Sequence, residues 1–361
     1  MNFWSIVLAK RNHCVAFILG LAIFGQQGFG LSNYDPRLLE RGFKKIDHVS
    51  RTNFNDFVLA DSKKSQAIDM LCSHLKIKFK ALGWDEDPCG VVKWQADLTT
   101  RQGNPLLYAV FGEGNEVTLF LGGVHPDELT PIHLTFKFAR FLNENRSSFQ
   151  AKHSKIVVAP LINPDGFIKQ SPTRSNGQVD VNRNFFTLDW YHRAQNEWVT
   201  KGASKDRYFP GYFPNTEIET IFQIQLLDIY EPDRIFSVHA PLGFYDYDGP
   251  GDQKPIRLSS NEKQAKQLVY EVSRKSENYR IVDYSFFPGS LGNFAGNERN
   301  LPTITLELET TKPNLVDSYW KKFLPALMQA ITYSFKKREY LQIKAPKFYR
   351  DFYAIEATKS S

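Results

Sequence analysis

Two residue types that bind metal ions lie three positions apart in one segment of this chain. Residues 119–129 read LFLGGVHPDEL, in which the apolar residues are typical of the end of a buried strand and Gly123 opens a tight turn. His125 and Glu128 follow at a spacing of i and i+3, which places both side chains on one side of a turn that enters a helix. They would supply two thirds of a His/His/Glu zinc site, a ligand set that leaves one coordination position for water. Taken alone, a His and a Glu at this spacing more often share a loop by chance.

Two further candidates belong to apolar segments of the kind that form buried strands. His239 ends such a segment in FSVHAPLG, and Glu307 lies in ITLELET. In open α/β sheets functional groups gather at the carboxyl ends of strands, so we expect these side chains near His125 and Glu128. His239 alone would more often be a hydrogen-bonded core histidine. Glu307 and Glu309 alternate onto one face of their strand, so spacing cannot decide which acid serves the site.

The elements that must position these residues follow from the hydrophobic pattern. Apolar residues that recur every three or four positions predict helices over residues 62–82, 131–143, 217–230, 260–279 and 319–335. Short apolar runs predict strands over residues 91–98, 106–111, 117–121, 156–161, 234–238 and 303–308. Because strands alternate with helices, we expect an α/β fold with a mixed, mostly parallel twisted sheet and helices on both faces.

The first thirty residues are typical of a secretory signal. Lys10 and Arg11 precede an apolar core over residues 15–25, which is short for a bilayer span. We expect a Sec-type signal peptide over residues 1–30 and a secreted or periplasmic protein, with an uncleaved signal anchor as the alternative. No later segment is long and apolar enough to cross a membrane, so we expect no stable span after cleavage.

Charge and cysteine content narrow the function classes. The formal net charge of the 361 residues is +6, which suits an anionic envelope surface but is far from the footprint of a nucleic-acid-binding protein. We therefore expect no nucleic-acid partner. Cys72 and Cys89 are the cysteines that remain after signal cleavage, and in an exported protein they form either a disulfide or two separate buried thiols.

Five sequence blocks extend these observations. They read GGVHPDE, APLINPDG, TRSNGQVDVNRNF, SVHAPLGFYDYDGP and PTITLELET, and they lie between about Val91 and Phe335. In these blocks, and in their order, the chain resembles the zinc carboxypeptidase superfamily of the carboxypeptidase A type. It is most similar to the bacterial murein-peptide amidases and carboxypeptidases, which trim peptidoglycan peptides. The resemblance implies a zinc carboxypeptidase-like fold with residues 91–335 as catalytic domain. The hydrophobic pattern before it predicts an N-terminal extension with one helix over residues 31–90, and the composition after it predicts a basic tail over residues 336–361.

The resemblance also implies roles for the metal-binding residues and the nearby acid. His125, Glu128 and His239 would hold Zn²⁺, which supplies a nucleophile near neutral pH by lowering the pKa of water. Glu307, the acid inside TLEL, would be the general base, since the attacking water must lose a proton to a group within hydrogen-bond reach. Glu309 would then be an exposed or paired neighbour.

Three residues of the third block would bind the substrate. Arg174 would polarise the scissile carbonyl and hold its developing oxyanion, because an arginine keeps its charge in any pocket. Asn182 and Arg183 would grip the free terminal carboxylate, since a guanidinium matches a carboxylate with two parallel hydrogen bonds. The alternatives are a solvated loop arginine for Arg174 and a structural salt bridge for Arg183.

Part of the sequence departs from the digestive carboxypeptidases. The tyrosine that caps their substrate pocket has no evident counterpart in the loop FFPGSLGNFAGNERN. Asp246 or Asp248, with the loop over residues 289–297, would instead contact an unusual terminal residue such as meso-diaminopimelate, whose ammonium needs an acid. The alternative is that both aspartates cap turns next to Gly249 and Pro250.

These observations predict an exported zinc metallocarboxypeptidase that hydrolyses a terminal amide in peptidoglycan stem peptides, for example γ-D-glutamyl–meso-diaminopimelate. Its partner would be a peptide derived from peptidoglycan, and its oligomeric state is open. One alternative is a protein carboxypeptidase or an N-acyl amino-acid deacylase, because a carboxylate clamp suits any acid-bearing substrate. The other is a non-catalytic envelope-binding module, which would have no need of a general base.

Overall fold

The computed structural model describes residues 54–150, 153–169, 178–250, 260–282 and 284–335. The chain divides into two compact units, residues 1–53 and 54–361, and every described residue belongs to the second. The predicted signal peptide, the predicted basic tail and Arg174 therefore lie outside the described residues. In the described part of the chain, no helix has the length and apolar character needed to cross a membrane.

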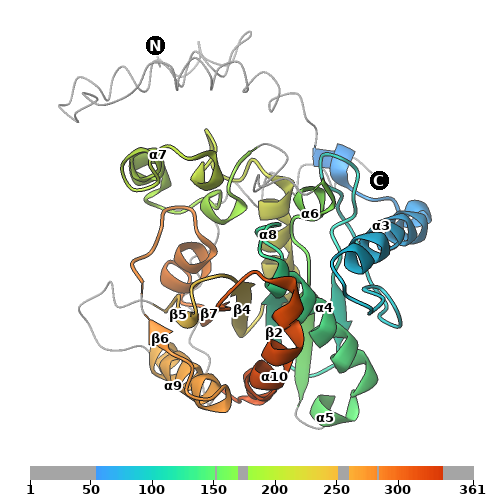
Figure 1. The fold of residues 1–361 in the computed structure, drawn as a ribbon. Helices are drawn as coiled ribbons and strands as arrows, with labels where there is room; N and C mark the ends of the chain where they lie inside the picture. The colour runs from blue at the N-terminus through green and yellow to red at the C-terminus, as the bar shows by residue number, and fades with distance from the viewer. Residues whose placement is uncertain (1–53, 151–152, 170–177, 251–259, 283, 336–361) are drawn as a thin grey trace, which may run out of the picture. The chain divides into compact units, whose positions relative to one another are not determined.

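A mixed sheet forms the centre of the described domain (Figure 1). Its seven strands are β1 (Ala109–Phe111), β2 (Glu116–Leu121), β3 (Ser154–Ala159), β4 (Arg234–His239), β5 (Phe244–Tyr247), β6 (Ile281–Val282) and β7 (Thr303–Glu307). They lie in the order β1-β3-β2-β4-β7-β5-β6. Strands β3, β2, β4 and β7 are parallel, whereas β1 runs antiparallel to β3 and β5 runs antiparallel to β7. The predicted α/β fold with a mixed, mostly parallel sheet is confirmed.

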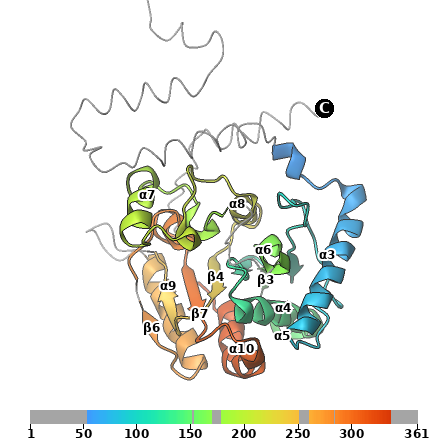
Figure 2. The same ribbon diagram turned by 45° about the horizontal axis from the view of Figure 1, so that its top comes forward.

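Helices cover both faces of the sheet. They are α3 (Asp61–Ala81), α4 (Leu129–Glu144), α5 (Ser147–Gln150), α6 (Pro164–Lys169), α7 (Trp190–Thr200), α8 (Ile218–Tyr230), α9 (Ser260–Lys275), α10 (Val316–Thr332) and the π-helix η5 (Gly292–Asn297). Short 3₁₀ helices are η2 (Phe54–Phe57), η3 (Val181–Arg183), η4 (Asp206–Tyr208) and η6 (Pro313–Leu315). Successive residues of β2 point to opposite faces. Phe120 packs in the cluster that contains α3, α4, α9 and α10, whereas Leu119 packs in the cluster that contains α8 and η5. Figure 2 shows α3 and α7 at different edges of this domain.

Helix α3 is part of the core. Its residues Leu71, Leu75 and Phe79 are fully buried in the same cluster as α4 and α10. Cys72 on this helix forms a disulfide with Cys89, with the two Cα atoms 5.7 Å apart. Of the two alternatives that the sequence left open for these cysteines, the structure shows the disulfide, which links α3 to the loop that follows it.

A fully buried arginine connects the start of β4 to the end of α10. Arg234 Nη1 donates to the carbonyl of Ala330 at 2.9 Å and to that of Tyr333, and Nη2 lies 3.2 Å from Glu116 Oε2. Its guanidinium carbon lies 4.5 Å from the centre of the Phe335 ring. Burial of this charge is tolerated because it is hydrogen-bonded and paired.

The predicted strand over residues 91–98 is wrong. The even-numbered residues of this segment are buried and the odd-numbered ones are largely exposed, so the chain has the alternation of a strand. It pairs only through isolated bridges, from Gln95 to Tyr108 and from Leu98 to Val58. The alternation thus reflects an extended segment lying on the core, without the continuous hydrogen-bonded ladder that defines a strand.

Candidate metal centre and active site

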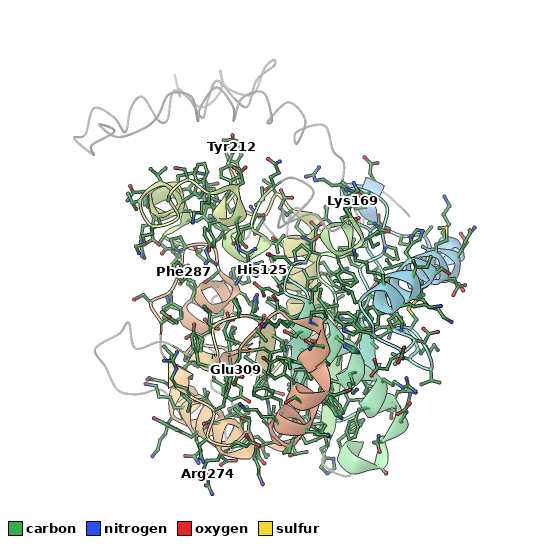
Figure 3. All side chains as sticks on the ribbon, viewed as in Figure 1. His125, Lys169, Tyr212, Arg274, Phe287 and Glu309 are labelled. Carbon is green, nitrogen blue, oxygen red and sulfur yellow. A yellow bond between two sulfur atoms is a disulfide. The ribbon has the colours of Figure 1, made fainter. Side chains whose placement is uncertain are left out.

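Three metal-binding side chains meet where β2 and β4 end. His125 and Glu128 lie on the turn after β2, and His239 is the last residue of β4. His125 Nδ1 lies 2.8 Å from Glu128 Oε1. His239 Nδ1 lies 3.2 Å from His125 Nδ1 and 3.0 Å from Glu128 Oε2. The structure thus brings together, around one point, the three ligands predicted from distant parts of the sequence, and Figure 3 shows His125 in the interior of the domain.

The donor atoms fit a zinc ion. Zinc is bound by histidine nitrogens at about 2.0–2.1 Å, so two nitrogens of one tetrahedral site lie about 3.3 Å apart. The two Nδ1 atoms of His125 and His239 are 3.2 Å apart, and the Glu128 carboxylate lies against both. Two imidazoles and one carboxylate are also the ligand set typical of catalytic zinc.

The far nitrogen of each imidazole is held by a hydrogen bond. His125 Nε2 lies 3.0 Å from Asp180 Oδ1, and His239 Nε2 lies 3.0 Å from Ser237 Oγ. In the tautomer that carries the ring hydrogen on Nε2, which the Asp180 carboxylate favours for His125, the Nδ1 lone pair is available to a metal. Both rings are buried, with 6% of His125 and 3% of His239 exposed, so their orientation is also fixed by packing.

The carboxylate of Glu128 is oriented from both sides. Its Oε2 accepts a hydrogen bond from the backbone nitrogen of Ala240 at 3.2 Å. Burial tends to raise the pKa of Glu128, but the fields and hydrogen bonds of His125 and His239 outweigh it, so the pKa lies well below its usual range. Glu128 is therefore ionised, as a metal ligand must be.

Sequence reasoning missed Asp180. This acid is 1% exposed, and besides His125 it accepts a hydrogen bond from the backbone nitrogen of Asn182 at 3.0 Å, which caps η3. A carboxylate that holds the second nitrogen of a ligating histidine is a common support of zinc sites. The available signal was its place in the block VDVNRNF, two residues before Asn182, because a predicted histidine ligand implies a partner of this kind.

Glu307 lies beside the metal ligands. In the parallel pair β4–β7, His239 and Glu307 are register partners, so their side chains leave the same face of the sheet. Oε2 of Glu307 is buried and has no hydrogen-bond partner among the residues that the structure describes. Burial raises the pKa of Glu307 to about 7, with the field of His239 opposing the rise and that of Glu128 adding to it. A carboxyl group with a pKa near neutrality can accept a proton and return it.

Glu309 is excluded from the site by its surroundings. Its side chain is 52% exposed and pairs with Lys322 at 3.0 Å. Figure 3 shows Glu309 away from His125. The choice between Glu307 and Glu309, which strand spacing left open, is therefore made by burial.

Asn182 and Arg183 contact the segment that leads into η5. The backbone nitrogen of Leu291 donates to Asn182 Oδ1 at 2.8 Å. Arg183 Nη1 donates to the carbonyl of Asn182 at 2.6 Å, and its guanidinium carbon lies 4.3 Å from the centre of the Phe287 ring. Phe287 is itself 39% exposed. Cation–π stacking of this kind restricts the rotation of an arginine.

Two aspartates lie on or just after β5, the strand that pairs with the Glu307 strand β7. In the antiparallel pair β5–β7, Asp246 is the register partner of Thr305, which lies on the same face as Glu307. Thr305 Oγ1 donates to Asp248 Oδ2, and the backbone nitrogen of Tyr284 donates to Asp246 Oδ1 at 3.1 Å. Burial raises the pKa of Asp248 well above its usual range, and the field of Asp246 adds to the rise. The structure therefore places the two predicted aspartates together, on the face that carries the candidate base.

Gly292 in η5 makes room for one of these aspartates. A side chain at this position would begin 2.3 Å from Asp248 Oδ1, closer than non-bonded atoms approach. The glycine thus lets η5 lie directly against the carboxyl group of Asp248.

Arg207 also reaches the metal centre, and sequence reasoning did not single it out. It lies in η4, where Nη1 donates to Asp127 Oδ2 and Nη2 lies 3.5 Å from Glu128 Oε1. Its side chain is 32% exposed, whereas that of Glu128 is 5% exposed. The pKa of Arg207 is raised because its pairing with Asp127 and the field of Glu128 outweigh the opposing effect of burial. A guanidinium therefore stands between the buried ligand and solvent.

Comparisons with known proteins agree with this geometry. The family model described as zinc carboxypeptidase matches residues 95–332, close to the range expected from the five blocks. A search of curated protein sequences finds no match. Among solved structures, bovine thrombin-activatable fibrinolysis inhibitor in complex with tick carboxypeptidase inhibitor is 14% identical over 73% of this chain and 95% of that chain, with a TM-score of 0.53.

Two other solved structures extend the comparison. Carboxypeptidase A from Helicoverpa armigera is 15% identical over 81% of this chain and 78% of its own, with a TM-score of 0.52. Murein-tripeptide amidase MpaA from Escherichia coli O157 is 21% identical over 66% of this chain and 91% of its own, with a TM-score of 0.46. The similarity to the insect enzyme supports the fold, and the family model spans both metal-bearing turns and Glu307. The chain therefore belongs to the zinc carboxypeptidase family and is a zinc-dependent metallocarboxypeptidase.

Proposed function

We propose that this metallocarboxypeptidase is exported and hydrolyses a terminal amide bond in peptidoglycan stem peptides, such as that between γ-D-glutamate and meso-diaminopimelate. The observation that carries the proposal is the pair of acids, Asp246 and Asp248, on the same face of the sheet as Glu307. Such acids suit a terminal residue that carries an ammonium group in its side chain. The amino-terminal sequence, with Lys10, Arg11 and the apolar core after them, supports export.

Different described residues would carry out different steps of the hydrolysis. Zinc, when bound by His125, Glu128 and His239, supplies a Lewis acid for the scissile carbonyl and for water. Glu307 would take a proton from the water whose oxygen bonds to the carbonyl carbon, and the bond between that carbon and the amide nitrogen would then break. Glu307 would return the proton to the departing amine, so that the same carboxyl group acts first as base and then as acid.

The terminal residue would be held at two points. Asn182 and Arg183 would bind its free carboxylate, which restricts cleavage to chain ends. Asp248, assisted by Asp246, would bind the side-chain ammonium. The pKa of Asp248 is raised by burial and by the field of Asp246, so a cation bound beside the two carboxyl groups would offset that field, and the acid pair favours a cationic residue over an apolar one.

Mass spectrometry of muropeptides before and after incubation with the zinc-loaded protein tests this function. We expect release of meso-diaminopimelate from the murein tripeptide. Parallel incubations use an N-acyl amino acid and peptides that end in Lys or Phe. Cleavage of these other substrates without cleavage of the tripeptide would overturn the proposed substrate and favour a protein carboxypeptidase or a deacylase.

The acid pair is tested by a matched set of variants. Asp248→Asn should lower kcat/KM for the diaminopimelate substrate by tenfold or more and have little effect on a substrate that ends in an apolar residue. Asp233→Asn serves as control, because Asp233 is buried at the opposite end of β2, where it accepts a hydrogen bond from the backbone nitrogen of Val117. Equal losses on both substrates in Asp248→Asn would show that the acid only supports the fold.

The non-catalytic alternative is disfavoured by Glu307. A binding module has no need of a buried carboxyl group with an unsatisfied oxygen beside a metal-ligand set. Tight zinc binding without hydrolysis of any peptide in the set would support that alternative.

A further inference from the structure

We infer that Arg207 binds a carboxylate on the residue that precedes the scissile bond, so that the enzyme favours an acidic residue on the amino side of the cleaved amide. The inference rests on the proposed direction of binding, in which Asn182 and Arg183 hold the free carboxylate of the terminal residue. Helix η4 would then bind a part of the substrate for which we assign no other described element.

Arg207 and Arg183 lie beside different parts of the site. Arg207 contacts Asp127 and Glu128 on the turn after β2. Asn182, next to Arg183, instead contacts Leu291 in the segment before η5, a helix that packs against β7. In the sheet, β4 lies between β2 and β7, and the metal ligands stand at the ends of β2 and β4. A substrate with its terminal carboxylate at Arg183 and its scissile carbonyl at the metal centre therefore extends toward Arg207.

The Arg207 guanidinium has hydrogen-bond donors left for a substrate. A guanidinium has five N–H groups, and the contacts with Asp127 and Glu128 are made by Nη1 and Nη2. Each of these nitrogens carries two hydrogens, so a bidentate carboxylate finds donors that these contacts do not use. The side chain is 32% exposed, whereas the ligand beneath it is buried, so a substrate reaches Arg207 without displacing Glu128.

The Arg207 guanidinium is oriented by a neighbouring acid. Asp127 holds it in place, and Asp127 is itself only 32% exposed, so the arginine is anchored before substrate arrives. An anchored arginine loses little conformational entropy on binding. Asp127 and Glu128 also offset the charge of Arg207. A substrate carboxylate would therefore be bound mainly through directed hydrogen bonds to the guanidinium.

The proposed substrate carries a carboxylate at this place. When glutamate is linked through its γ-carboxyl group, its α-carboxylate is free and lies on the amino side of the scissile bond. Arg207 would distinguish this carboxylate from the corresponding amide. The same discrimination is expected for an ordinary acidic residue that precedes the bond, so the inference can be tested without a cell-wall substrate.

Two substrate pairs test the inference. The first is L-Ala-γ-D-Glu-meso-diaminopimelate and its analogue in which the α-carboxylate is an amide. The second is an N-acyl-Glu dipeptide and the matching N-acyl-Gln dipeptide with the same terminal residue. We expect the wild-type enzyme to prefer the carboxylate by about tenfold or more in kcat/KM, mostly through KM. Arg207→Gln should abolish the preference by slowing the carboxylate substrate alone, and Arg207→Lys should retain part of it.

Arg140→Gln provides the matched control. Arg140 is also a partly exposed arginine paired with an acid, Glu144, but it lies on the outer side of α4. This variant should keep the wild-type preference, and zinc content and thermal unfolding of all variants should confirm that they fold and bind metal.

Three results would overturn the inference. They are an equal rate on carboxylate and amide in the wild type, an unchanged preference in Arg207→Gln, and an equal loss on both substrates in Arg207→Gln. The last would mean that the arginine only supports Glu128. If the wild type cleaves neither stem peptide but Arg207→Gln abolishes the preference within the dipeptide pair, the cell-wall function fails while the role of Arg207 stands.

Discussion

His239 and Glu307 are direct register partners in the parallel ladder between β4 and β7, and the backbone nitrogen of Leu308 donates to the carbonyl of His239 at 2.8 Å. Adjacent strands lie about 4.8 Å apart, so the ladder itself sets the separation between a metal ligand and the candidate base. The reacting groups are therefore placed by backbone hydrogen bonds, and only their last few ångströms depend on side-chain rotamers.

Replacement of Glu307 by Gln should remove the proton acceptor and leave the metal ligands intact. We expect kcat to fall by about 10²–10⁴-fold with zinc content unchanged, measured by steady-state kinetics and elemental analysis. Glu309→Gln is the control, because Glu309 is exposed and paired with Lys322, and its activity should stay close to that of the wild type. Activity of Glu307→Gln within a few-fold of the wild type would contradict the assignment.

Asp180→Asn should weaken zinc binding. An amide in place of the carboxylate no longer favours a hydrogen on His125 Nε2, so the lone pair on Nδ1 is less available. Affinity for zinc should fall by about 10–100-fold, measured by competition with a chelator of known affinity. Asp69→Asn, on the exposed face of α3, should have no effect. An unchanged affinity in Asp180→Asn would show that packing alone orients the ring.

The pair between Glu86 and His133 predicts how stability depends on pH. The hydrogen bond from His133, against the opposing effect of burial and with help from Lys137, lowers the pKa of Glu86 to about 2 from its ordinary 4.5. A lowered pKa in the folded state means that the stabilisation is fully present above pH 4.5 and is lost as the pH falls toward 2. Because the side chain is 29% exposed, we expect about 1–2 kcal/mol rather than the full value of the shift.

Chemical denaturation of Glu86→Gln across pH measures this contribution. The free energy of unfolding should be lower than that of the wild type at pH 7, and the difference should shrink between pH 5 and pH 2. Glu144→Gln, which removes an exposed pair with Arg140, should change stability by a few tenths of a kcal/mol. A deficit in Glu86→Gln that is the same at every pH would point to lost packing.

Removal of the disulfide should destabilise the attachment of α3. Cys72 and Cys89 are 17 positions apart, and closing a loop of this length is worth about 3 kcal/mol in the unfolded-chain entropy model. The double variant Cys72→Ser/Cys89→Ser should unfold at lower denaturant concentration than the wild type, and reductant should shift the wild type toward the variant. If reductant leaves the unfolding transition of the wild type unchanged, the disulfide does not contribute to the free energy of unfolding.

Much of the fold could be predicted from local pattern. The helix expected over residues 62–82 is α3, which has one strongly periodic buried face. The strand expected over residues 117–121 is β2, whose short apolar run is buried on both faces. The strand expected over residues 91–98 failed although its alternation is real, since a ladder also needs a partner and no sequence pattern supplies one. Strand β5 was missed because it is short and Asp246 interrupts its aromatic residues.

The site was predictable where chemistry restricts residue type. His125, Glu128 and His239 meet as expected, because few side chains bind zinc and each follows an apolar strand. Asp180 and Arg207 were not found, since acids and arginines are common in loops and only the fold shows which of them reach a ligand.

The buried Arg234 sets a boundary for shortened forms of this protein. Its guanidinium donates hydrogen bonds to carbonyl groups at the end of α10 and pairs with Glu116, and it does so at the start of β4, the strand whose other end carries His239. A chain cut before Tyr333 would remove one of the carbonyl groups to which this buried guanidinium donates, together with the Phe335 ring that lies against it. Variants that keep Phe335 retain these contacts, and we expect shorter ones to loosen β4 at the end opposite to His239.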